Sequence, residues 1–218
     1  LLSLIERSVK KFPEDSVLVI TSKVVALCEG RFIPQEASLK EAIIKEEADY
    51  YLPKEKSRYG IPLTIKDHAF IARSGIDASN TSGYYSLLPK DSYATAKKVR
   101  TYLIKRFGIK NAGVIIVDSH SSPLRRGVTG VAIGWSGFCG LKGYEQVPDI
   151  FGTNFTTHAN HVDALATTAS LAMGEGNEQT PIVLITDVPF VTFQASSPTK
   201  KELIYFKPKL KDDLFAPL

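Results

Sequence analysis

Cysteine and long apolar runs are scarce in this chain of 218 residues. Its two cysteines, Cys28 and Cys139, are far apart in the sequence and have apolar or glycine-rich neighbours, so we expect reduced, buried thiols and neither a disulfide nor a catalytic thiol. No apolar run approaches the roughly 20 residues that a membrane span requires. The first seven residues lack the basic start of a secretory signal. We therefore expect a cytoplasmic location and no membrane partner, and, because the chain does not begin with Met, a natural protein that extends further upstream.

An excess of charge of one sign is also missing. The formal net charge is +4, and the hydrophobic content of 44% and charged content of 23% are ordinary for a globular domain. The basic excess lies near the end of the chain, interleaved with acidic residues, at Lys200, Lys201, Lys207, Lys209 and Lys211. We expect this run to be a solvated edge and not a nucleic-acid surface.

Helical and strand patterns alternate along the chain without a strict β-α-β order, a repeat or a low-complexity linker. Apolar spacing predicts helices over residues 2–12, 37–51, 92–107 and 162–173. Short apolar runs predict strands over residues 17–21, 63–65, 69–72, 112–117, 181–186 and 203–206. These elements indicate an α+β fold of mixed sheets with packed helices, in one domain over residues 1–218.

The run from Asp118 to Gly134 is the most informative stretch of the sequence. It begins with Asp118 and Ser119, directly after the predicted buried strand of residues 112–117. Carboxylate and hydroxyl oxygens at a strand end suit Mg²⁺ or Mn²⁺. Arg125, Arg126 and the following glycines offer guanidinium groups and accessible backbone N–H groups to a polyphosphate. The run therefore predicts a site for a metal and a phosphate.

Two further stretches carry groups of the same chemistry. Asp77 lies in a turn of oxygen donors between Ser74 and Asn80, which by itself is typical of an Asx-turn, but together with Asp118 it could hold one hard cation. Ser22 and Lys23 directly follow the predicted strand of residues 17–21. They could bring a hydroxyl and an ammonium to a phosphate, or form a helix cap with an exposed lysine.

A rival site lies later in the chain. His158, His161 and Asp163 are close in sequence and could bind zinc, which would indicate a metallohydrolase. Such a cluster at the start of a helix is more often a cap with solvent-facing polar residues, and no other histidine or cysteine lies nearby in sequence to complete three ligands. Glu175 follows Gly174 in a predicted helix C-cap and loop, and its carboxylate could reach a second metal.

Five motifs in this order resemble the γ-glutamyl ligases of coenzyme F-420, over residues 1–186. They are Ser22-Lys23, the stretch 75–80, the stretch 87–91, the run 118–134 and Met173-Gly174. The resemblance implies an intertwined α+β homodimer with two interleaved subdomains. It also implies an enzyme that uses GTP, or ATP, with Mg²⁺ or Mn²⁺ to add L-glutamate to the lactyl-phosphate tail of the deazaflavin coenzyme through an acyl phosphate. Trp135 and Phe138 are the aromatic residues that we expect at the dimer interface.

The resemblance also assigns roles by position. It implies one metal on Asp77 and Asp118, a second on Ser119 and Glu175, and nucleotide contacts from Ser22, Lys23 and Asn80. Arg125 and Arg126 would neutralise charge during phosphoryl transfer, and no nucleophilic serine or cysteine is needed.

The sequence departs from the family pattern at several positions. Leu27 stands where the family has a lysine, Ser121-Ser122 replaces a glycine and an arginine, and Ala164 replaces an acidic residue. We therefore expect metal and nucleotide handling to be retained better than recognition of the usual coenzyme, with another carboxylate acceptor, such as a folate, preferred. The same departures allow a nucleotide-binding homologue without turnover.

Overall fold

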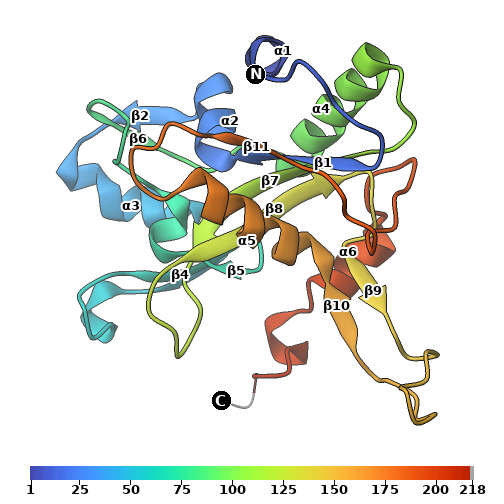
Figure 1. Cartoon of the computed structure of the whole chain (residues 1–218). Coiled ribbons are helices and arrows are strands. Elements are labelled where there is room, and N and C mark those ends of the chain that lie inside the picture. Colours follow the sequence, from blue (N-terminus) through green and yellow to red (C-terminus); the bar gives the residue numbers. More distant parts are fainter. Residues whose placement is uncertain (217–218) are drawn as a thin grey trace.

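A mixed four-stranded sheet forms the centre of the protein in the computed structural model, which describes residues 1–216 (Figure 1). Its strands, in spatial order, are β11 (Ile182–Ile185), β1 (Ser16–Thr21), β7 (Ala112–His120) and β8 (Thr129–Ser136). The inner strands β1 and β7 are parallel, and each outer strand is antiparallel to its neighbour. The last two residues of the predicted domain lie outside the described residues.

Helices α4 (Ser92–Phe107) and α5 (His161–Met173) cover opposite faces of this sheet. In β7, Val114 and Ile116 point to the α4 face, whereas Ile115 and Val117 point to the α5 face. Successive side chains of a strand alternate between faces, so a sheet covered on both sides requires an unbroken apolar run. Residues 112–117 are continuously apolar because both faces of β7 are buried.

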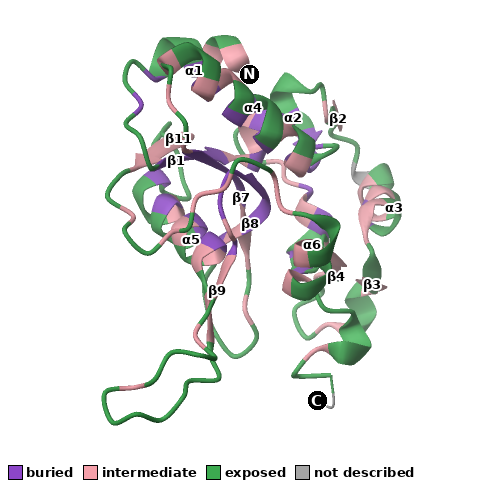
Figure 2. Ribbon diagram, turned by 90° about the vertical axis from the view of Figure 1, so that its right-hand side faces the viewer, coloured by how far each residue is buried: buried purple, intermediate pink, exposed green. Residues whose placement is uncertain are grey.

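Smaller elements surround the central sheet and confirm the α+β class. Three small sheets consist of β2 (Phe32–Pro34) with β6 (Tyr84–Ser86), of β3 (Tyr50–Leu52) with β4 (Leu63–Lys66) and β5 (Ala69–Phe70), and of β9 (Leu141–Gly143) with β10 (His158–Asn160). The remaining helices are α1 (Leu2–Ser8), α2 (Ser22–Cys28), α3 (Ala37–Glu47) and α6 (Lys200–Phe206), with 3-10 turns at Lys54–Lys56, Ala72–Gly75 and Leu210–Asp212. The loop that joins β9 to β10 projects from the body of the protein and is largely exposed (Figure 2).

Residues next to helix α4 form both of its ends. The Asp91 side chain caps α4 by accepting a hydrogen bond from the backbone N–H of Ala94 at 2.8 Å. Gly108 ends the helix with a φ of 67°, a left-handed conformation that glycine adopts without steric cost.

Several predicted elements were wrong in type or length. Residues 203–206, expected to be an edge strand, belong to helix α6, because Thr199 and Glu202 form a capping box that starts a helix there. Helix α1 ends at Ser8, although Val9 and Phe12 remain buried in the extended chain that follows. Helix α3 ends at Glu47, and β7 continues past residue 117 to His120.

The surroundings of some side chains also differ from expectation. Cys28 is exposed, not buried, and Cys139 is half-buried; both are free thiols. Trp135 and Phe138, expected at an interface, lie in the core beneath α5 with exposed fractions of 1% and 0%. Lys207, expected on a solvated edge, lies over the ring of Tyr93 at 5.1 Å. None of the helices in the described part of the chain has the length and apolar character to cross a membrane.

Candidate active site at the carboxyl ends of β1 and β7

The parallel pairing of β1 and β7 brings two distant motifs together. Thr21 at the end of β1 is the partner of Val117 in β7. Ser22 and Asp118 therefore follow side by side, although they are 96 residues apart in sequence. The carboxyl ends of parallel strands are where α/β sheets commonly bind ligands, since no side chain of the strand itself fills the space beyond.

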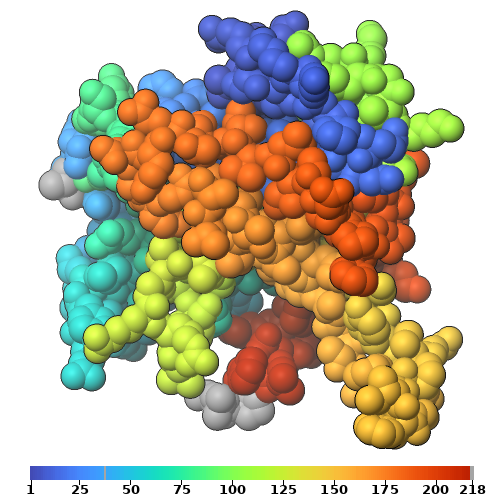
Figure 3. Space-filling model, viewed as in Figure 1, coloured from blue at the N-terminus to red at the C-terminus, as the bar shows by residue number. Residues whose placement is uncertain are grey.

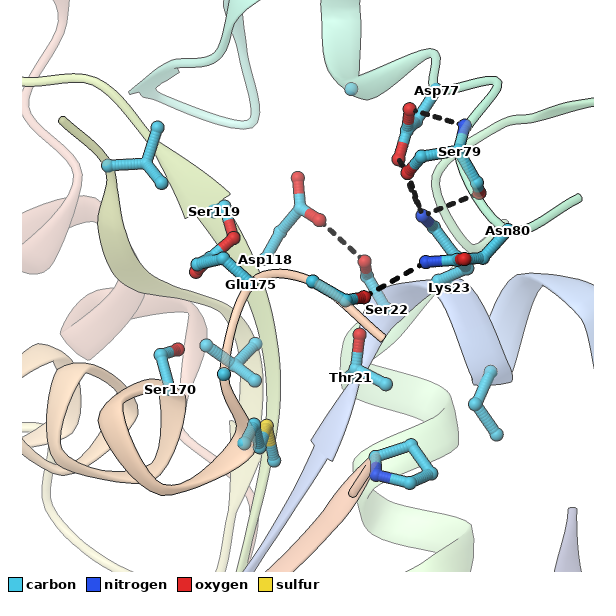
Figure 4. Close-up of a pocket in the computed structure, with 18 of the residues that line it drawn as sticks. Thr21, Ser22, Lys23, Asp77, Ser79, Asn80, Asp118, Ser119, Ser170 and Glu175 are labelled. Atoms are coloured by element: carbon cyan, nitrogen blue, oxygen red, sulfur yellow. Dashed lines mark hydrogen bonds and ion pairs between the residues drawn. The ribbon is translucent and has the colours of Figure 1, made fainter. Parts of the chain in front are cut away.

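A cavity of about 730 Å³ opens at this edge of the sheet. Every residue that the family resemblance assigned to the metal or the nucleotide lines it, and Figure 4 shows how their side chains lie around one space: Ser22, Lys23, Asp77, Asn80, Asp118, Ser119 and Glu175. The structure thus gathers seven residues from four separate parts of the sequence. The structure shows that these residues share one cavity, and the roles assigned to them remain predictions.

Asp118 is held by the hydroxyl of Ser22, which donates a hydrogen bond to its carboxylate at 2.6 Å. Burial raises the pKa of the Asp118 carboxyl to about 6, and the bond from Ser22 only partly offsets this rise. The negative charge of Asp77 adds to the rise. A nearby cation would therefore stabilise the charged form of the Asp118 carboxyl.

Asp77 lies opposite, in a segment bridged to Ser86 by two backbone hydrogen bonds. Its carboxylate accepts the Lys23 ammonium at 2.5 Å and the hydroxyl of Ser79 at 2.5 Å. Burial alone would raise the pKa of the Asp77 carboxyl, but the hydrogen bonds from Lys23 and Ser79 outweigh it and lower the pKa. The two aspartates therefore have pKa values shifted in opposite directions.

The loop after α5 closes the third side of the cavity. The hydroxyl of Ser119 donates to both carboxylate oxygens of Glu175, at 3.0 and 2.9 Å. The side-chain amide of Asn80 donates to the carbonyl of Gly176 at 3.1 Å. These contacts fix the loop against β7 on one side and the segment around Asp77 on the other.

The two predicted catalytic arginines are not part of this cavity. Arg125 and Arg126 are exposed on the loop between β7 and β8, and neither lines the cavity. Within residues 1–216, the side chain of Arg125 donates one hydrogen bond, to the carbonyl of its neighbour Leu124. The glycine-rich sequence indicated a phosphate loop, but β7 and β8 pair up to His120 and Thr129 and carry this loop outward.

The rival zinc site is not formed either. His158 contacts the carboxylate of Glu145 at 2.5 Å and the hydroxyl of Tyr205 at 2.9 Å, while Asp163 accepts the backbone N–H of Ala132. Among the described residues, no three histidine, cysteine or acidic side chains are grouped to hold a metal. The histidine cluster is better explained as local structure at the start of α5.

In the main cavity, too, the described residues contain no group of three histidine, cysteine or acidic side chains close enough to hold one metal ion. The donors there still fit a hard cation by type, since Asp77, Asp118 and Glu175 are carboxylates and Ser119 supplies a hydroxyl. Mg²⁺ in particular is usually held by one or two carboxylates together with substrate phosphates, without a complete protein cage.

Comparison with known proteins identifies the family of this chain. The sequence profile of the F420-0:Gamma-glutamyl ligase family matches residues 1–187. The chain belongs to that family. It is 36% identical to the "Coenzyme F420:L-glutamate ligase" of Methanococcus maripaludis, covering 95% of this chain and 88% of the relative. It is 32% identical to the protein of the same name from Methanocaldococcus jannaschii, covering 81% and 78%. The protein is therefore an enzyme of the γ-glutamyl ligase class.

The cavity is also lined by residues that the sequence analysis did not single out, and by two of the positions at which the chain departs from the family pattern. Arg73 and Glu178 line the cavity; the signal for Arg73 was its place directly before the Ser74–Asn80 stretch. Leu27 also lines the cavity and is 42% exposed. Ser121 lines it as well, whereas Ala164 is exposed and does not line it.

Proposed function

We propose that this enzyme adds L-glutamate to a carboxylate acceptor, at the expense of GTP or ATP and with Mg²⁺ or Mn²⁺, through an acyl phosphate. The observation that carries the proposal is the convergence of the seven predicted ligand residues on one cavity. An amide does not form from a carboxylate and an ammonium in water without activation. Transfer of the γ-phosphate to the acceptor carboxylate supplies that activation.

The charges of the cavity support a role for a divalent cation. Four carboxylates line it, from Asp77, Asp118, Glu175 and Glu178, against two cationic side chains, Lys23 and Arg73. A polyphosphate entering this acidic space would be repelled unless cations accompanied it. The carboxylates would hold Mg²⁺ or Mn²⁺, which in turn would neutralise the phosphates and the charge that develops during their transfer.

The protein's own task in this reaction is to position the substrates. Lys23, Ser22 and Asn80 would orient the nucleotide, and Asp77 and Asp118 would hold the metal ion against it. Once the acceptor carboxylate has taken the γ-phosphate, the amine of L-glutamate attacks the acyl carbon, the amide C–N bond forms and phosphate leaves with the C–O bond electrons. Such transfers are accelerated chiefly by positioning and charge stabilisation, with little covalent chemistry by the protein.

The acceptor is proposed to be coenzyme F-420 or a related carboxylate such as a folate. The relatives' names specify coenzyme F-420, but Leu27 presents an apolar side chain to the cavity. Losing one charged contact typically costs about 1.5–3 kcal/mol, or one to two decades of affinity. We therefore expect poor extension of the deazaflavin coenzyme and better extension of another acceptor.

We also propose that two chains form a homodimer. The loop between β9 and β10 projects from the body of the protein (Figure 3), and Ile150 and Phe151 at its tip are 92% and 88% exposed. Exposed apolar side chains on a projecting segment are typical of an interface. We assign the interface to this loop and no longer to Trp135 and Phe138, because both of those side chains are buried within the chain.

The decisive experiment is a ligase assay with GTP or ATP, Mn²⁺, L-glutamate and a panel of carboxylate acceptors, in which mass spectrometry follows increments of one glutamyl unit. Release of nucleoside diphosphate that depends on both acceptor and glutamate supports the proposal. Nucleotide binding without release of diphosphate with any acceptor would favour the alternative of a binding protein without turnover. Efficient extension of coenzyme F-420 would show that Leu27 is a neutral replacement.

A further inference from the structure

One cationic side chain of the active-site cavity has no hydrogen-bond or ion-pair partner among the described residues. Lys23 is committed to Asp77 and Ser79, with contacts of 2.5 to 3.0 Å. Arg73 also lines the cavity and is exposed, and its guanidinium has no hydrogen-bond or ion-pair partner within residues 1–216. It lies four residues before Asp77 in the chain, in a cavity whose other charged side chains are mostly carboxylates.

The backbone that carries Arg73 is strained and firmly held. Arg73 and Ser74 have φ values of 56° and 55°, and Gly75 follows with 74°, so three consecutive residues are left-handed. Such a conformation costs non-glycine residues about 1–2 kcal/mol each. It persists here because the buried Ser74 donates its N–H to the Thr64 hydroxyl at 2.8 Å and its own hydroxyl to the carbonyl of Ile44 at 2.9 Å. Strain maintained in this way is typical of ligand-binding segments.

We propose that Arg73 binds a carboxylate of the incoming L-glutamate, an inference that rests on the proposed ligase function. The acceptor carboxylate is consumed in the reaction and must lie against the phosphates. The two carboxylates of L-glutamate are not consumed, so each requires a separate partner. The acidic cavity suits the ammonium group of the amino acid but repels its carboxylates. The free guanidinium of Arg73 would neutralise one of these carboxylates, because its planar fork matches a carboxylate in a bidentate pair.

The proposal predicts a selective loss of glutamate affinity. Arg73→Ala should weaken L-glutamate binding by about 10- to 100-fold, the usual effect of losing a charge-assisted hydrogen-bonded pair. Arg73→Lys keeps the charge but loses the fork, so its affinity should lie between those of the wild type and the alanine variant. Nucleotide affinity should stay unchanged in both, because Arg73 is not proposed to contact the phosphates.

Calorimetry on the full chain tests this without relying on turnover. L-glutamate is titrated into wild type, Arg73→Ala and Arg73→Lys in the presence of Mn²⁺ and the non-hydrolysable β,γ-imido analogue of GTP, whose own affinity is measured separately. Arg58→Ala is the matched control, since Arg58 is exposed and does not line the cavity. Thermal melts of each variant confirm that the fold is retained.

Each outcome bears on the proposal in a defined way. Weaker glutamate binding in Arg73→Ala, with nucleotide affinity and the Arg58→Ala variant unaffected, supports it. An equal loss of nucleotide affinity would make Arg73 a phosphate contact and overturn it, as would unchanged glutamate affinity. If the wild type binds the nucleotide analogue but no glutamate, or binds neither, the proposed ligase function fails first and the assignment of Arg73 fails with it. Titration with L-glutamine and L-isoglutamine then identifies the carboxylate concerned, because only one of the two amides should be insensitive to Arg73→Ala.

Discussion

Replacing Asp118 by Asn should make the protein more stable and at the same time inactive. Burial raises the pKa of the Asp118 carboxyl from 3.8 to about 6, so the folded protein holds a charge at neutral pH that its surroundings disfavour. A shift of about two units corresponds to about 3 kcal/mol at most, at 1.36 kcal/mol per unit. Asn retains an oxygen that can accept the hydrogen bond from Ser22. We therefore expect a gain of about 1–3 kcal/mol at pH 7.5, or roughly 3–10 °C in Tm for a domain of this size.

The pH dependence has a definite sign. The unfolded chain loses the Asp118 proton near pH 4 and the folded chain near pH 6, so the folded state binds more protons between these values. Its stability should fall as pH rises through this window, and Asp118→Asn should remove this contribution. The advantage of the variant should therefore be small at about pH 4 and complete above about pH 6.5.

Thermal unfolding in EDTA between about pH 4 and pH 8 measures this, and Asp77→Asn is the matched control. The pKa of Asp77 is lowered and not raised, because Lys23 and Ser79 stabilise its charge against the effect of burial. Asp77→Asn should therefore lower stability at pH 7.5, by less than about 1 kcal/mol since the pair is partly exposed. Mn²⁺ binding and glutamyl transfer should be lost in both variants. An Asp118→Asn protein that is less stable at pH 7.5, or that retains normal turnover, would refute the reasoning.

Three further predictions follow from the structure. Gly75→Ala should destabilise the protein by about 2–4 kcal/mol in urea unfolding, because φ is +74° and a Cβ would lie 2.7 Å from the Leu88 side chain; a change below about 0.5 kcal/mol would contradict the observed close contact. His158→Ala should retain normal turnover and metal content by elemental analysis, since His158 contacts Glu145 and Tyr205 and no metal group; loss of bound zinc would revive the hydrolase alternative. Light scattering at micromolar concentration should give the mass of two chains, and Phe151→Asp should lower it to that of one; a monomeric wild type would rule out the dimer.

The sequence by itself determined those helices and strands whose signals lie within or next to the element. The apolar run of residues 112–117 predicted a buried strand, and the apolar spacing of residues 92–107, between Asp91 and Gly108, predicted a helix, because capping and burial patterns depend on neighbouring residues. It failed at residues 203–206, where short apolar spacing fits a strand or a helix equally and the capping box of Thr199 decides.

For the candidate site, the sequence indicated which residues could take part, and the tertiary structure decided which of them meet. Motif chemistry selected the residues that could bind metal and phosphate, but only the register of β1 against β7 placed Ser22 beside Asp118. A different pairing, that of β7 with β8, carried Arg125 and Arg126 away from the cavity, whereas Arg73, from the 3-10 turn Ala72–Gly75, lines it. A motif specifies which groups a segment offers, whereas their meeting depends on strand pairings between residues far apart in sequence. Those pairings are set by how both faces of the sheet are buried, which no short segment of the chain encodes alone.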